Sequence, residues 1–263
     1  MSNWNDFEKE CTDYLKQKFG EYARFTQQGG ADSTVSDIFV ETNNGNSFYI
    51  DVKLSPAQCG QFVLKPNISS RTFEYSKKNA NRINIFAKKI MEHMNKNFDE
   101  FREAGTTGKD IIMKNDSSVF SDWIIETYKE KGTKFFITNN HTILPIDRFQ
   151  EYFSVSAKYR IKRSGSDSVG KSRFDHVLNY IKTHDYEITD TRTEGDKLFV
   201  TSPKNLHNIR FILGDYEYMF SKRETEYEIR KLSNTYNANV IFSIKQKGDN
   251  PGLSDDGFID FLK

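Results

Sequence analysis

Two aspartates and a lysine interrupt apolar runs near the start of this chain. Asp37 opens one run, Ile38–Val40, while Asp51 and Lys53 end a second run that begins at Phe48. Side chains two positions apart in a strand point to the same face, so Asp51 and Lys53 share a face. Hard cations such as Mg²⁺ prefer carboxylates, and a lysine beside them can orient water or stabilise charge that grows on a phosphate. These residue types indicate a divalent-metal site with a basic neighbour.

The segment between the two runs predicts a tight turn. Residues 42–47 read Thr-Asn-Asn-Gly-Asn-Ser, and an Asn-Gly pair between apolar runs favours a β-hairpin. A hairpin would place Asp37 alongside Asp51 and Lys53. The simpler alternative is that the Asp-x-Lys pattern arose by chance and that an aspartate merely ends a strand. We favour the functional interpretation, because polar residues at core-like positions usually serve a function.

A third acid is predicted on an amphipathic helix upstream of the hairpin. Apolar residues recur there at helical spacing: Trp4, Phe7, Cys11, Tyr14 and Leu15. Glu8 lies on the inner edge of this stripe and is expected to face the sheet, whereas Glu10 lies on the opposite edge. Two alternatives remain open: Glu8 could be a solvated flank residue, and Glu10 could be the helix glutamate of the site.

Taken together, Glu8, Asp37 and Asp51-Val52-Lys53 resemble the active-site pattern of the PD-(D/E)XK nuclease superfamily. This group includes type II restriction endonucleases and archaeal Holliday-junction resolvases. The resemblance covers Phe7 through Lys53, with Ser36 at the position of the proline in the motif's name. It implies an α/β (α+β) fold with a mixed central sheet flanked by helices. It also implies that Glu8, Asp37 and Asp51 hold Mg²⁺ and that Lys53 orients or activates water.

Composition excludes several classes of protein. The chain has 263 residues and a net charge of +1, so a nucleic-acid surface would have to be a local basic patch. Only Cys11 and Cys59 are present, without a C-x-x-C spacing, so neither a disulfide framework nor a zinc ribbon is indicated. No apolar run reaches membrane-spanning length and the first residues lack signal-peptide character. We expect a soluble cytoplasmic protein with no membrane partner.

A basic segment in the second half is the candidate nucleic-acid contact. Lys158-Tyr159-Arg160-Ile161-Lys162-Arg163-Ser164-Gly165-Ser166 reads as a strand that runs into a small-residue loop. Strand alternation would put Lys158, Arg160 and Lys162 on one face, where they could contact DNA phosphates. Backbone amides around Ser164 and Ser166 would allow close approach. A solvated strand face is the alternative. The run also bears a weaker resemblance to segments of type II restriction enzymes.

The remaining pattern predicts a catalytic domain, 1–154, and a C-terminal α/β DNA-recognition subdomain, 155–263. In the first we expect a long helix over 77–101, a short helix over 121–131 and a buried central strand over 134–138. In the second we expect a helix over 174–183 and hairpins that turn at 194–196 and 214–215. A capping box, Ser221–Glu224, predicts a helix that extends to Tyr236.

Other chemistries lack their motifs. The sequence contains no H-E-x-x-H and no G-x-x-x-x-G-K-[ST], and Gly29-Gly30 reads as an active-site loop. We therefore expect a Mg²⁺-dependent type II restriction endonuclease that acts on double-stranded DNA as a homodimer, since two-fold symmetry matches palindromic targets. The alternatives are a structure-selective repair or Holliday-junction nuclease, and a non-catalytic DNA-binding module on a nuclease fold. The chain is long for a resolvase of this core, which favours the restriction enzyme.

Overall fold

The computed structural model describes residues 4–28, 35–114, 116, 118–248 and 251–263. The chain forms two compact units, one of Met1–Ile161 with Ala238–Lys263 and the other of Lys162–Asn237. This division differs from the expected one in two ways. The boundary falls after Ile161 and not near residue 155, and the last part of the chain, from Ala238 on, belongs to the first unit. Gly29-Gly30 and the side chains of Trp4 and Ser164 lie outside the described part.

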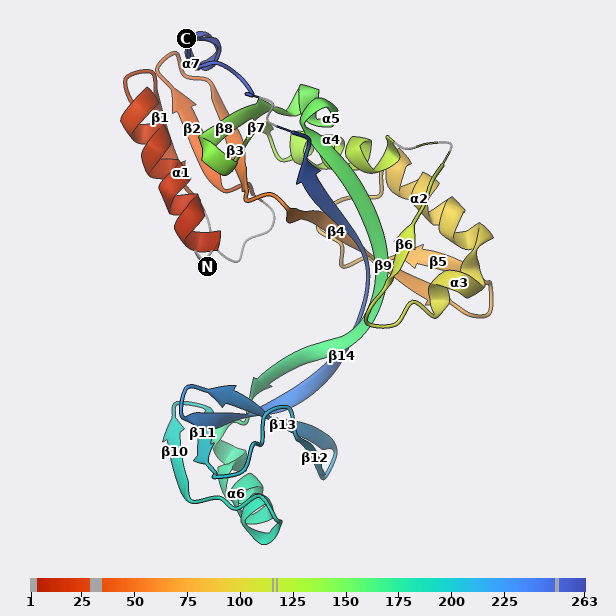
Figure 1. Ribbon diagram of the computed structural model, residues 1–263. Coiled ribbons are helices and arrows are strands. Elements are labelled where there is room, and N and C mark those ends of the chain that lie inside the picture. The colour runs from red at the N-terminus through yellow and green to blue at the C-terminus, as the bar shows by residue number, and fades with distance from the viewer. Residues whose placement is uncertain (1–3, 29–34, 115, 117, 249–250) are drawn as a thin grey trace. The chain divides into compact units, whose positions relative to one another are not determined.

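A five-stranded mixed sheet forms the centre of the first unit (Figure 1). Its order is β1-β2-β3-β7-β8, and β3 and β7 run parallel while the other neighbours run antiparallel. The central strand predicted over 134–138 is β7, and it lies next to the hairpin strand β3. The bounds are β1 Ala23–Gln27, β2 Ile38–Thr42, β3 Ser47–Lys53, β7 Thr133–Thr138 and β8 Thr142–Pro145.

Helices cover both faces of this sheet, so the predicted fold class is confirmed. On one face, α1 (Trp4–Phe19) and α7 (Asp255–Leu262) enclose a core that includes Phe135 and Ile137. On the other face, α4 (Val119–Glu130) packs against Phe136, whose ring centre lies 5.1 Å from that of Tyr128. Successive residues of β7 thus point to opposite faces, and each face is buried by its own helix layer.

A second set of strands completes the first unit. β4 (Ala57–Asn67) pairs with β5 (Thr72–Tyr75) and with the last part of β14 (Glu226–Gln246). β9 (Phe153–Ser168) pairs with β6 (Lys109–Ile111). The shorter elements are η1 Asn139–His141, η2 Ile146–Arg148 and α5 Phe149–Tyr152. Within the described part of the chain, every helix is too short or too polar to span a bilayer.

The long helix expected over 77–101 is wrong at both ends. The helix α2 spans Ile85–Lys96 because the Asn84 side chain accepts a hydrogen bond from the Ala87 amide at 2.8 Å and so caps the first turn. Upstream, the Asn79 side chain bonds the backbone of Val63 and holds the chain in a non-helical path. A break at Asn97 then separates α2 from the short helix α3, Phe98–Arg102.

The second unit combines part of a nine-stranded sheet with one helix of two or more turns. Its strand order is β10-β11-β14-β13-β12, and both predicted hairpins are present. The predicted helix over 174–183 is α6. A core that includes Val177, Ile181 and Phe220 joins helix and sheet. The bounds are η3 Lys171–Arg173, α6 Phe174–Thr183, β10 Asp190–Glu194, β11 Lys197–Thr201, β12 Arg210–Leu213 and β13 Tyr216–Arg223.

The helix expected from the capping box at Ser221 is wrong. The chain turns at residues 224–225, and β14 then pairs antiparallel with β13 in the register Phe220↔Ile229. Tyr227 and Ile229 are buried against the core, a spacing of two that suits a strand and not a helix. The tertiary pairing outweighs the local capping signal.

Candidate active site

The predicted hairpin is confirmed and fixes Asp37 against the strand of Asp51. β2 and β3 pair antiparallel with Ile38 opposite Ile50, and Gly45 supplies the positive φ of 87° in the turn. Asp37 lies immediately before β2, where its carboxylate Oδ2 accepts a hydrogen bond from the Val52 amide at 2.7 Å. The backbone between Asp51 and Lys53 therefore holds the Asp37 side chain directly.

Asp51 and Lys53 share one face of β3, as strand alternation predicts. Their side chains form an ion pair and are only 5% and 15% exposed. The intervening Val52 and the preceding Ile50 point to the opposite face and pack in the core under α1. On the neighbouring strand, the Thr138 hydroxyl donates a hydrogen bond to the Lys53 carbonyl, which ties β3 to β7 at the site.

Glu8, and not Glu10, faces the two aspartates. The Glu8 side chain reaches Asp37 from α1 and is 1% exposed, although neither of its oxygens has a hydrogen-bond partner among the described residues. The Glu10 side chain is exposed and forms an ion pair with His141, Oε1 to Nε2, at 3.1 Å. The position of Glu8 on the inner side of α1 agrees with the helical periodicity of the sequence.

Burial makes this cluster a costly place for negative charge. It raises the pKa of the Glu8 carboxyl, and it raises that of Asp37 despite the nearby ammonium of Lys53. Burial also raises the pKa of Asp51 to about 7, against the opposing effect of Lys53. For Lys53, burial alone would lower the pKa, but Asp51, Tyr128 and Asp37 raise it, so the ammonium stays protonated.

The donor set of the cluster fits a hard divalent cation. All three acids offer carboxylate oxygens, and both oxygens of Glu8 are buried without a hydrogen bond from the described residues. Within the described ranges, no three His, Cys, Asp or Glu side chains form a ready-made metal cluster. Mg²⁺ commonly takes one or two protein carboxylates and completes its shell with water and substrate phosphate. Asp37 and Asp51 with Glu8 behind them suit this mode of binding.

A cleft of about 900 Å³ opens onto the cluster. Its walls come from β3, β4, the segment 75–81 and α4, all in the first unit. Besides Asp37, Asp51 and Lys53, the lining includes Gln58, Gln61, Lys78, Asn81, Trp123, Tyr128 and Lys131. Sequence reasoning missed the contribution of Tyr128 and Lys131. The available signal was the position of Lys131 at the end of a predicted helix, shortly before the strand predicted to be central in the sheet.

The basic segment is a strand throughout, so the loop expected at residues 164–166 is wrong. Tyr159 is buried, and Lys158 and Arg160 on either side of it are half-buried, which confirms the alternation. Lys158 lies 3.5 Å from Asp110 on β6. Lys162 and Arg163 are exposed and belong to the second unit. The Ser166 carbonyl accepts a hydrogen bond from Arg230 at 2.8 Å.

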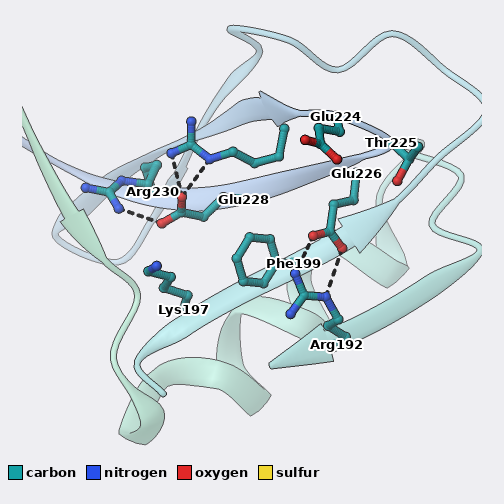
Figure 2. A pocket seen from close by; sticks show the side chains of 9 residues that line it. Arg192, Lys197, Phe199, Glu224, Thr225, Glu226, Glu228 and Arg230 are labelled. Carbon is teal, nitrogen blue, oxygen red and sulfur yellow. Dashed lines mark hydrogen bonds and ion pairs between the residues drawn. The ribbon is translucent and has the colours of Figure 1, made fainter. Parts of the chain in front are cut away.

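A separate hollow in the second unit is rich in charge but internally paired (Figure 2). Glu228 is buried and binds both Arg223 and Arg230, while Arg192 binds Glu226. The Arg192 guanidinium also stacks 4.0 Å from the centre of the Phe199 ring. These ion pairs link β10 and β13 to β14 and give the hollow a structural role.

Comparison with known proteins identifies the family. No family model and no curated protein sequence matches the chain. A solved structure of HhaI endonuclease in complex with DNA is similar to it at 39% sequence identity and a TM-score of 0.79. The similarity covers 99% of this chain and 98% of that chain, so it spans both compact units. HhaI endonuclease is a type II restriction enzyme. The chain therefore belongs to the HhaI endonuclease family of type II restriction endonucleases.

Proposed function

We propose that this chain is a Mg²⁺-dependent enzyme that hydrolyses phosphodiester bonds of double-stranded DNA at a specific short sequence. The observation that carries the proposal is the convergence of Glu8, Asp37, Asp51 and Lys53 at one buried corner of the sheet. The membership of this chain in a family of type II restriction endonucleases supports the same reaction. The cleft beside the cluster provides access for a phosphate of the DNA backbone.

Each residue of the cluster would have a distinct part. Asp37 and Asp51 would hold the metal ion with their carboxylates, and Glu8 would complete the negative charge behind them. A bound divalent ion polarises a phosphoryl oxygen and lowers the pKa of water. The hydrogen bond from the Val52 amide fixes the orientation of the Asp37 carboxylate. Lys53 stays protonated and would donate a hydrogen bond to the attacking water or to a phosphate oxygen.

DNA binding would draw on cations outside the cluster. Lys158, Arg160, Lys162 and Arg163 would contact phosphates, and the backbone around Ser164 and Ser166 would allow the strand to approach the DNA closely. The pairing of Lys158 with Asp110 is exposed to solvent and would not prevent such a contact. The second unit would then contribute to DNA recognition, as expected for the C-terminal part of the chain. A homodimer remains the predicted assembly.

Digestion of phage DNA is the direct test. With Mg²⁺ present we expect discrete fragments, and none when EDTA replaces the metal. A smear, or cutting confined to branched junctions, would indicate the repair or junction nuclease instead. DNA binding with no cutting in any divalent metal would indicate a non-catalytic module and would contradict the proposal.

A further inference from the structure

The cleft beside the acidic cluster contains a second lysine whose role the PD-(D/E)XK pattern does not define. Lys131 caps the C-terminus of α4 and lines the same cleft as Asp37, Asp51 and Lys53. Its side chain is half-buried, and its ammonium lies 5.2 Å from the centre of the Tyr128 ring. The ammonium of Lys53 lies 5.7 Å from the centre of the same ring. Tyr128 is thus flanked by both cations.

The chain directly after Lys131 is tied to β3 and to the segment just before β2. Gly132 takes a φ of 80° and turns the chain from α4 into β7, and its carbonyl accepts a hydrogen bond from the Tyr49 amide of β3 at 3.0 Å. The Thr133 hydroxyl lies 2.7 Å from that of Ser36, the residue next to Asp37. The position of Lys131 relative to the two aspartates is therefore built into the sheet and does not depend on a loose loop.

Charge balance shows what this cation could supply. Glu8, Asp37 and Asp51 together carry three negative charges when ionised, a divalent metal ion would bring two positive charges, and Lys53 adds one. The site would then be neutral before DNA arrives. Lys131 gives it a net positive charge, which matches the single negative charge of a phosphodiester.

The surroundings of Lys131 agree with this role. Burial lowers the pKa of its ammonium, and the neighbouring charge of Lys53 acts in the same direction, while Asp51 opposes both. A cation held in such a place gains stability when an anion binds beside it, because interactions between charges strengthen where water is excluded. Charge complementarity that grows as the phosphate gains negative charge accelerates the chemical step.

We infer that Lys131 is a second active-site cation, which contacts the phosphate undergoing cleavage and stabilises the charge that develops on it. This inference rests on the proposed function, since it assigns a role within the same reaction. Lys129 provides a matched control. It has the same charge and lies in the same last turn of α4, but it pairs with Asp147 and does not line the cleft.

The test compares Lys131→Met, Lys131→Arg and Lys129→Met with the wild type. Single-turnover cleavage in Mg²⁺ should slow about 10²-fold in Lys131→Met, the scale of a lost charge-stabilising donor. DNA affinity in Ca²⁺, measured over a range of salt, should show a salt slope reduced by about one for this variant. Lys131→Arg should keep the salt slope and recover part of the rate. Lys129→Met should match the wild type in both measurements.

Three outcomes would overturn the inference. One is a wild-type cleavage rate in Lys131→Met. Another is slow cleavage with an unchanged salt slope, which would make the role of Lys131 structural. The third is an equal loss of cleavage rate and salt slope in Lys129→Met, which would show that any lysine removed from this part of the surface has the same effect. Should Lys131→Met melt well below the wild type, Lys131→Gln, which keeps a polar side chain of similar length but removes the charge, replaces it in both measurements. Failure of the wild type to cut any DNA would instead remove the proposed function itself.

Discussion

At the scale of single residues, the site combines charges that the sequence predicted with one that it did not. Asp37, Asp51 and Lys53 could be predicted because a short turn between two apolar runs sets the hairpin register. Glu8 followed from helical periodicity. Lys131 was missed although the order of helix and strand around it was predicted, because its place in the cleft depends on the parallel register of β7 against β3. No local signal in the sequence sets that long-range register.

Replacement of Asp51 should separate catalysis from binding. Asp51→Asn keeps the size of the side chain but removes the carboxylate proposed to hold the metal, so cleavage in Mg²⁺ should fall at least about 10³-fold. DNA binding in Ca²⁺ should be equal or tighter, because a negative charge near the phosphate is gone. Gel shift and single-turnover cleavage measure the two effects. Substantial cleavage by Asp51→Asn would contradict the assignment, and Glu41→Gln, an exposed acid on β2, is the control.

The buried acids should also make the metal-free protein less stable at high pH. The pKa of Asp51 is raised from 3.8 to about 7, so the folded state binds a proton more tightly than the unfolded state. Stability from this group is fully present below the unfolded pKa and is lost as pH rises through about 7. The Glu8 and Asp37 pKa values are raised too and act in the same direction.

We therefore expect the melting temperature in EDTA to fall as the pH rises from 5 to 8. The corresponding loss in the free energy of unfolding should be on the order of a few kcal/mol. Asp51→Asn should flatten this dependence. Added Mg²⁺ should raise the melting temperature more at pH 8 than at pH 5, because the ion binds ionised carboxylates. A metal-free stability that rises over this range would show that the acids are not buried as described.

At the scale of elements, local signals predicted the hairpins and α6 but failed where tertiary pairing decides. Ser221–Glu224 has the residues of a capping box, which locally favours the start of a helix. In the folded unit, the same residues end β13 and turn into β14, whose Tyr227 and Ile229 fill the core. The burial that a strand gains at these positions exceeds the small free energy of a helix cap.

Glu228 should strengthen the association of β13 with β14. Its carboxylate is buried and binds Arg223 and Arg230, which lower its pKa although burial opposes them (Figure 2). Glu228→Gln should destabilise the protein by on the order of 2 kcal/mol, below the usual cost of breaking a buried pair because Arg223 is half-exposed. Chemical denaturation at pH 7 measures the loss.

The pH dependence and a second variant check the explanation for Glu228. A lowered pKa means that the stability from this group is present above the unfolded pKa, about 4.3, and is lost as pH falls through the folded value. The difference between wild type and Glu228→Gln should therefore shrink below about pH 4. Glu194→Gln, which removes an exposed partner of Arg192, should cost less than about 0.5 kcal/mol. Equal losses in the two variants would refute the buried-pair argument.

Substitutions in the basic segment of β9 can distinguish residues that contact phosphates from residues that read bases. Replacement of Lys158 or Lys162 by Ala should weaken binding to cognate and random duplexes alike and reduce the salt slope by about one. Arg160 and Arg163 could instead read guanine with two hydrogen bonds, and loss of such a contact costs about 1–3 kcal/mol at one base pair. Salt titrations on both duplexes distinguish these cases. Unchanged affinity and slope in all four variants would place this strand away from DNA.

At the scale of the whole molecule, one chain carries one cluster of Glu8, Asp37, Asp51 and Lys53, whereas a duplex has two strands to cut. A palindromic site offers the same contacts to each half of a two-fold dimer, and such a dimer presents one cluster to each strand. We therefore expect a homodimer on cognate DNA that converts supercoiled plasmid to linear product in one binding event. Sedimentation of the free protein and of its DNA complex gives the stoichiometry.

Plasmid cleavage gives an independent measure of the same assembly. If two clusters act together, little nicked circle should accumulate during a single turnover, and the rate per site should fall when the protein is diluted below the dimer's dissociation constant. Mixing wild type with excess Asp51→Asn subunits should convert linear product into nicked circle, because mixed dimers carry one working cluster each. A monomer in both sedimentation experiments, with nicked circle as an obligatory intermediate and no effect of added Asp51→Asn beyond competition, would mean that one cluster cuts the two strands in succession.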